Sequence, residues 1–136
     1  MTPEQAKLVK ETWARMAPDL GRAGELFYNR LFQAAPDTRG LFTGDVQVQQ
    51  ARFLDMLARV VAASDDLEGL RPQLHELGRR HQGYGVRPEH YESFAEALVW
   101  TLQVILGPDL TPEAEAAWCA LLEETAERML EAPAEP

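Results

Sequence analysis

A few side chains with distinct chemistry stand out from an otherwise apolar helical sequence, and His81 is the most informative of them. Residues 77–86 end a helical pattern at His81 and then run into a loop broken by glycines. Upstream, Tyr28 and Gln49 lie in two separate helical segments, and Phe42 lies in the loop between them. One imidazole, two neutral polar side chains and one aromatic ring in an apolar helical chain are what a buried haem would need.

The scarcity of other metal ligands also favours haem. His81 follows Leu77 by one helical turn on the apolar side, where an imidazole without a partner is unfavourable unless it binds a metal. Zinc requires four ligands, and the sole cysteine, Cys119, lies in a distant helix. Iron held by four porphyrin nitrogens needs only one axial ligand from the protein. His75 and His90 lack this setting, so we interpret them as structural or solvated.

Size and composition restrict the classes of function. The chain has 136 residues and a net charge of −9, which argues against binding to nucleic acid or to an anionic membrane. We expect one domain over residues 1–131, a disordered tail over 132–136, and no room for a reductase or another output domain. No apolar run is long enough to span a membrane and no signal peptide precedes the first helix, so a cytoplasmic location is the default expectation.

Helical periodicity and helix caps predict an all-α fold of about six main helices and one short turn-like helix. Thr2-Pro3-Glu4 is typical of a helix start, and Thr111-Pro112-Glu113 repeats the pattern before the last helix. Between them we expect a break from Pro18 to Gly21, a helix ending near Ala35, a turn-like segment over 36–42, and helices over 46–63, 67–81 and 88 to 105 or 106. Ser64-Asp65-Asp66 is expected to end one helix and cap the next, and Gly83 and Gly85 to stop the helix that carries His81.

These segments, in this order, resemble the globin family, and single-domain bacterial globins and the globin domain of flavohaemoglobins in particular. The resemblance spans nearly the whole chain, from Trp13 to Trp118. Leu41-Phe42 after a short turn is similar to the globin segment whose phenylalanine wedges against the haem. The 32 residues that separate Gln49 from His81 equal the spacing that globins use between their distal and proximal positions.

The resemblance implies a globin fold around haem b, with a role for each matching residue. His81 would be the proximal iron ligand, and Gln49 would occupy the distal position. Tyr28, in a Phe27-Tyr28 segment similar to the distal tyrosine segment of bacterial globins, would join Gln49. Phe42 would stack on the porphyrin and Phe53 would narrow the ligand site, although both suit an ordinary core equally well. Tyr28 also suits the surface, but the polar residues after it indicate that one of residues 27 and 28 faces inward.

Further residues are expected around the haem. Leu57 continues the face of Gln49, while Leu77 and Val86 flank the proximal segment. Tyr91 matches a tyrosine of bacterial globins that can hydrogen-bond the proximal imidazole. Arg52 and Arg80 are candidates for pairing with the haem propionates, and each is equally well explained as a solvated charge.

One departure from the family pattern concerns the proximal side. In some relatives a glutamate of the last helix supports the proximal tyrosine and gives the iron peroxidase-like character. Here that position is Pro133, and the nearest acid before it is Glu131. The departure weakens a peroxidase-like function.

The resemblance implies reversible O₂ binding for storage, delivery or scavenging. The Tyr28 hydroxyl and the Gln49 amide would donate hydrogen bonds to bound O₂, whose outer atom is partly negative, so we expect tight binding and slow release, with CO favoured less. The alternative is oxidation of nitric oxide (NO) to nitrate, which needs an external reductase. A sensor is disfavoured because no output domain is expected, and a haem-free helical interaction domain is a fourth alternative. The sequence leaves the oligomeric state open.

Overall fold

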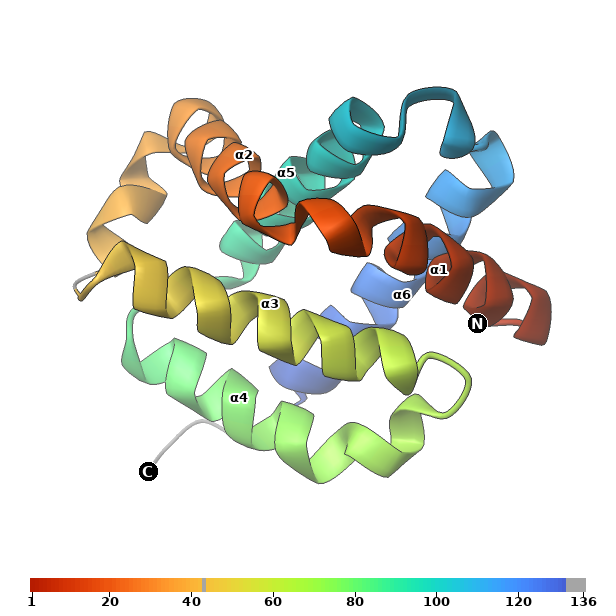
Figure 1. Ribbon diagram of the computed structural model, residues 1–136. Coiled ribbons are helices and arrows are strands. Elements are labelled where there is room, and N and C mark those ends of the chain that lie inside the picture. Colours follow the sequence, from red (N-terminus) through yellow and green to blue (C-terminus); the bar gives the residue numbers. More distant parts are fainter. Residues whose placement is uncertain (43, 132–136) are drawn as a thin grey trace.

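The computed structural model of the protein describes residues 1–42 and 44–131, and these residues form helices and no strands (Figure 1). The all-α prediction is therefore confirmed for the described part of the chain. The α-helices are α1 (Pro3–Met16), α2 (Leu20–Ala34), α3 (Val46–Ala62), α4 (Arg71–Gly83), α5 (Pro88–Leu106) and α6 (Pro112–Leu130). Short 3-10 segments lie at their junctions: η1 (Ala17–Asp19), η2 (Pro36–Leu41), η3 (Leu67–Leu70) and η4 (Gly107–Asp109).

The first and last helices begin where their capping residues predict. The Thr2 hydroxyl accepts a hydrogen bond from the backbone N–H of Gln5, whose side chain accepts one from the backbone N–H of Thr2. The Thr111 hydroxyl accepts a hydrogen bond from the backbone N–H of Ala114 in the same manner. Each threonine satisfies a backbone donor that the helix itself leaves unpaired, which fixes the helix start.

Other boundaries differ from the prediction. The expected helix over 67–81 is divided into η3, in which Leu67 is buried, and α4, which begins with Pro72 in its first turn. Helix α4 ends at Gly83, two residues after the expected end at His81. Gly85, with a φ of +89°, lies in the turn that follows. The expected cap by residues 64–66 is also wrong, because no side chain caps η3 and Asp65 pairs with Lys10 instead (3.1 Å).

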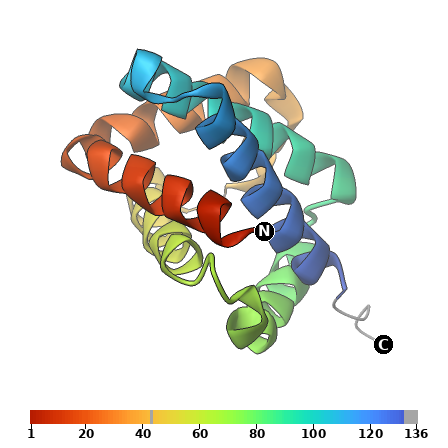
Figure 2. The same ribbon diagram turned by 90° about the vertical axis from the view of Figure 1, so that its right-hand side faces the viewer.

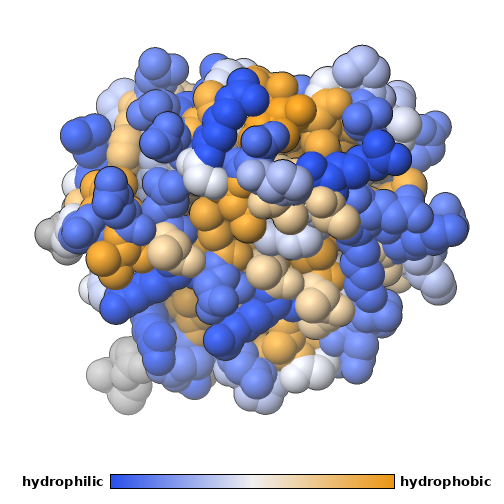
Figure 3. Space-filling model, in the orientation of Figure 1, coloured by the Kyte–Doolittle hydropathy of each residue, from blue (hydrophilic) through white to orange (hydrophobic). Residues whose placement is uncertain are grey.

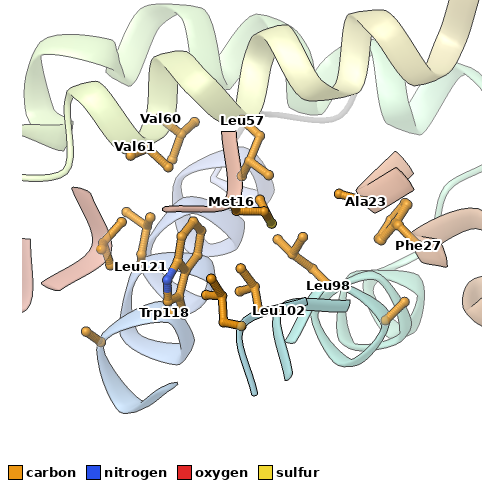
Figure 4. Packing of buried hydrophobic residues seen from close by; sticks show 14 of the residues in the cluster. Met16, Ala23, Phe27, Leu57, Val60, Val61, Leu98, Leu102, Trp118 and Leu121 are labelled. Atoms are coloured by element: carbon orange, nitrogen blue, oxygen red, sulfur yellow. The ribbon is translucent and has the colours of Figure 1, made fainter. Parts of the chain in front are cut away.

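The core lies where α1, α2, α3, α5 and α6 meet, and Figure 4 shows side chains from these helices directed toward one another. Trp118 of α6 is fully buried, and its indole N–H donates a hydrogen bond to the hydroxyl of Thr12 in α1 (2.7 Å). The buried indole thus has the polar partner that it requires, and this bond joins α6 to α1.

Helix α4, which carries His81, is attached mainly through α6. Its close backbone contacts are with α6 and η3, whereas those with α3 and α5 are sparse. The approach to α6 depends on Gly78, because a Cβ atom there would overlap the backbone carbonyl of Met129. Figure 2 shows α6 running past α1 toward α4, and Figure 1 shows α3 and α4 lying one above the other.

The surface is polar over most of the face drawn in Figure 3, with small separate hydrophobic patches. No helix in the described ranges is both long enough and apolar enough to cross a membrane.

Candidate functional site

His81 is held in one tautomer by its own helix. Its Nδ1–H donates a hydrogen bond to the backbone carbonyl of Leu77 (2.8 Å), which can only accept. Burial lowers the pKa of His81, and the bond to Leu77 partly opposes that shift. The ring is therefore neutral at neutral pH, and its lone pair lies on Nε2, for which no described residue is a hydrogen-bond partner. A neutral imidazole whose other nitrogen is fixed by a carbonyl is the form in which histidine binds a metal.

The turn after α4 brings Tyr91 beside this imidazole. The backbone N–H of Val86 donates to the carbonyl of His81 (2.9 Å), and Gly85 adopts the left-handed conformation that the turn requires. The chain then enters α5, and the ring centroids of His81 and Tyr91 lie 6.3 Å apart with an angle of 28° between the planes. The structure therefore places the two expected proximal residues side by side.

Tyr28 is buried in α2 with two of the aromatic residues expected at the site. Its ring meets that of Phe42 edge-on, with centroids 5.2 Å apart, and that of Phe53 at 6.3 Å. Burial raises the pKa of Tyr28 to about 12, so the hydroxyl remains a donor throughout the physiological range. One of residues 27 and 28 was expected to face inward, and both Phe27 and Tyr28 are buried, because α2 is covered by α5 on one side and by α3 and η2 on others.

Gln49 and Gln50 have different environments, although they are neighbours at the start of α3. The Gln50 side chain lies over Gly24 of α2 and donates to the carbonyl of Gly21 (3.4 Å). The Oε1 atom of Gln49 is instead buried without a hydrogen-bond partner among the described residues. A buried amide oxygen without a partner is unfavourable by about 1–3 kcal/mol, so the Gln49 Oε1 atom is suited to a hydrogen-bond donor from outside the described residues.

Phe94, which the sequence reasoning missed, links the two groups of site residues. It lies three residues after Tyr91 on α5, and its ring is 6.2 Å from that of Phe42 and 6.1 Å from that of Phe27. The same Phe27 ring stacks on Phe53 at 4.5 Å. The one available signal in the sequence was the helical spacing from Tyr91, which places Phe94 on a similar side of α5.

The remaining predicted positions are less closely tied to this region. Leu57 is buried in the core, and Leu77 and Val86 are half-buried. Arg52 is exposed, and Arg80 is also exposed, with an ion pair to Glu76 (3.4 Å). These positions neither require nor exclude a contact with haem propionates.

No carboxylate of the described part of the last helix hydrogen-bonds Tyr91, whose pKa is raised by burial. Glu131 pairs with Arg71 (2.8 Å) and His75 (3.4 Å) in the first turns of α4, whereas His81 lies toward its end. Pro133 lies outside the described residues. His75 is therefore a partner of a surface carboxylate, in line with its interpretation as a structural or solvated residue.

Two other features bear on which ligand the site can hold. Among residues 1–42 and 44–131, no group of three or more His, Cys, Asp or Glu side chains is placed to hold a metal ion. An open groove of about 380 Å³ runs between α5 and α6 and has Tyr91 on its wall, but His81, Tyr28 and Gln49 do not line it. The groove is therefore distinct from the candidate site.

Comparison with known proteins identifies the family. The model of the family described as Globin matches residues 25–129, which is most of the chain. The chain belongs to the globin family. This confirms the resemblance and the globin fold expected from the sequence, and globin membership implies that the protein binds haem.

Individual relatives are similar at modest identity. The chain is 28% identical to a neuroglobin of Tetraodon nigroviridis, with 87% of this chain and 83% of the relative aligned. It is 29% identical to a flavohemoprotein of Bacillus subtilis (strain 168), over 82% of this chain and 29% of the relative. It is 33% identical to a flavohemoprotein of Bordetella parapertussis, over 96% of this chain and 33% of the relative. The chain thus spans about a third of the length of the flavohemoproteins.

The residues present fit a haem group. His81 offers one nitrogen lone pair on a half-buried ring, which is the single axial ligand that haem iron takes from a globin. Gln49 has a buried polar atom that no described residue satisfies, and Tyr28 holds a protonated hydroxyl among aromatic rings. A haem held here would have an aromatic and apolar surround with two polar side chains.

Proposed function

We propose that the protein binds O₂ reversibly at haem b, with His81 as the axial ligand and Tyr28 and Gln49 as hydrogen-bond donors to the gas. Haem, when bound, would supply the iron at which O₂ binds and takes on partial negative charge. The protein supplies the rest: one axial nitrogen, two donors and an aromatic enclosure. The storage, delivery or scavenging of O₂ would follow from slow release.

The observation that carries the proposal is the position of Tyr28, which is buried among aromatic rings with a phenol that stays protonated. The Nε2–H₂ group of Gln49 would be the second donor, whereas its unsatisfied Oε1 atom can only accept. A hydrogen bond to a charge-bearing acceptor contributes about 1.5–3 kcal/mol, and each 1.4 kcal/mol changes an equilibrium about tenfold. Bound CO is less polarised, so the same donors favour O₂ over CO. Two such donors would slow the release of O₂ by orders of magnitude relative to an apolar site.

The second candidate is an enzyme that converts NO and O₂ to nitrate. It is supported by the similarity to two flavohemoproteins, whose printed name denotes a flavin and a haem together. Each turnover consumes one electron, which must come from outside these 136 residues, so we propose an external reductase as the partner. The cytoplasmic location expected from the sequence stays a prediction.

Two measurements on the haem-loaded protein separate these functions. Stopped-flow release of O₂ tests the binding function, which predicts slow release and no sustained consumption of NO beyond one equivalent of bound O₂. Consumption of NO is then followed with NADH and a purified flavin reductase. Sustained turnover that needs the reductase favours the enzyme, whereas rapid release of O₂ contradicts the binding function.

A further inference from the structure

His90 has both ring nitrogens engaged, although it lies outside the candidate site. It is the third residue of α5 and its side chain is only 6% exposed. Its Nδ1 accepts a hydrogen bond from the backbone N–H of Arg87 (2.9 Å), which caps the start of α5. Its Nε2–H donates to the carboxylate of Asp37 (3.1 Å), 53 residues away in the sequence. The imidazole therefore joins two distant segments.

Each of these segments adjoins one side of the candidate haem site. Asp37 belongs to η2, which ends immediately before Phe42. Arg87 belongs to the link that connects the helix of His81 to the helix of Tyr91. The segments also approach each other beyond the imidazole, since a Cβ atom at Gly85 would lie 3.9 Å from the Leu41 side chain.

The geometry points to a positioning role for His90 and Asp37, and this inference rests on the proposed haem site. We propose that the hydrogen bond from His90 to Asp37 holds the segment that bears Phe42 against the link between His81 and Tyr91. The pair thereby keeps the distal and proximal sides of the haem site at a fixed separation. Neither residue is proposed to touch the haem.

The imidazole, and not the neighbouring arginine, makes the decisive contact. Arg87 also approaches Asp37, but at 3.7 Å between two exposed side chains, and it lies closer to Glu89 (3.1 Å). Exposed ion pairs of this kind contribute little. A hydrogen bond from a buried ring to a carboxylate is stronger, and the bond to His90 is the main cause that lowers the pKa of Asp37.

The segment that Asp37 anchors otherwise has its main close backbone contacts with α2. Thr38, the next residue, is fully buried, and its hydroxyl donates to the carbonyl of Ala35 (2.6 Å). This bond shapes η2 internally but does not connect it to α5. Loss of the Asp37–His90 bond therefore removes the strongest polar tie between η2 and the start of α5 while leaving the turn itself intact.

The test compares the rate at which haem passes from the loaded protein to an excess of apomyoglobin in matched variants. Asp37→Ala and His90→Phe remove the bond, whereas Asp37→Asn keeps an acceptor and removes the charge. His75→Phe is the control, because it removes another histidine–carboxylate pair on the surface. We expect haem transfer about tenfold faster in Asp37→Ala and His90→Phe, less than threefold faster in Asp37→Asn, and unchanged in His75→Phe.

Amide hydrogen exchange of the same variants gives a readout that does not depend on gas binding. Exchange is expected to accelerate in residues 36–42 and 84–87 and to remain unchanged in α1 and α6. The double variant of Asp37→Ala and His90→Phe should lose haem no faster than His90→Phe, since both substitutions remove the same bond and His90→Phe also removes the cap on the Arg87 N–H. The proposal is overturned if the effects of the two substitutions on the rate of haem transfer add in the double variant, or if Asp37→Ala transfers haem within twofold of the wild-type rate. If His90→Phe fails to fold, Asp37→Ala alone decides.

The two proposals can fail separately. Slow O₂ release by the wild type, together with unchanged haem transfer in the variants, overturns only the positioning role. Fast O₂ release by the wild type, together with faster haem transfer and exchange in Asp37→Ala, overturns only the binding function.

Discussion

Replacing Tyr28 with phenylalanine tests the proposed hydrogen bond to O₂ with little change to the packing. The ring contacts with Phe42 and Phe53 do not involve the hydroxyl, so Tyr28→Phe removes a donor and leaves the aromatic cluster in place. Burial raises the pKa of Tyr28, and no hydrogen bond to another residue within 1–42 or 44–131 contributes to that shift. The hydroxyl is therefore free to donate to a gas.

The expected size of the effect follows from this environment. A hydrogen bond from a neutral donor to a charge-bearing acceptor contributes about 1.5–3 kcal/mol, so the variant should release O₂ about 10- to 140-fold faster. The assay is stopped-flow displacement of O₂ by CO. Tyr84→Phe is the matched control, because Tyr84 is 66% exposed and loses the same atom. An unchanged rate in Tyr28→Phe, with haem still bound, would refute the reasoning.

The pH dependence of release provides a second check on the same group. Because burial raises the pKa of Tyr28 to about 12, the phenol stays protonated where a free tyrosine, with a pKa near 10, would be half ionised. An ionised phenol cannot donate and would repel the partly negative gas. We expect wild-type release to be constant from pH 7 to pH 10 and to accelerate only as the pH rises toward 12; acceleration centred at pH 10 would contradict the buried position.

Three further predictions follow from other contacts. Gly78→Ala forces α4 away from the Met129 backbone and should lower the free energy of unfolding by about 1–3 kcal/mol in urea titrations. Gly83→Ala is the control and should not destabilise the protein, because its added methyl group meets no neighbouring atom. Thr12→Val leaves the buried indole N–H of the α6 tryptophan without an acceptor and should cost about 1–3 kcal/mol in the same titrations, with no change in haem absorption. Gln49 is a poor iron ligand, so the ferrous, gas-free protein should show a five-coordinate absorption spectrum; a low-spin bis-histidine spectrum would mean that a second histidine binds the iron.

Local chemistry explains which parts of the fold could be predicted from the sequence. Helix starts at Thr2 and Thr111 depend on residues within one turn, and they were located correctly. Residues 67–83 are divided into η3 and α4, and α4 begins with Pro72 in its first turn. The pattern of apolar spacing therefore predicted a helix there but not its type or its start.

Long-range contacts explain what the sequence could not show at the site. The residues expected on the proximal side, His81 and Tyr91, do lie together, and Tyr28 lies with Phe42 and Phe53. Phe94 was missed because its partners come from α2 and from the segment after η2. The tie between Asp37 and His90 was missed because nothing near either residue indicates the other.

The axial role of His81 is the central claim, and the spectrum of the ferrous, gas-free protein tests it most directly. The wild-type protein, expressed with an ample supply of haem, is expected to be coloured and to show a single axial imidazole by resonance Raman spectroscopy. His81→Gly should lose that signal and regain it when free imidazole is added. A colourless wild-type protein, or an axial nitrogen signal that persists in His81→Gly without added imidazole, would contradict the account.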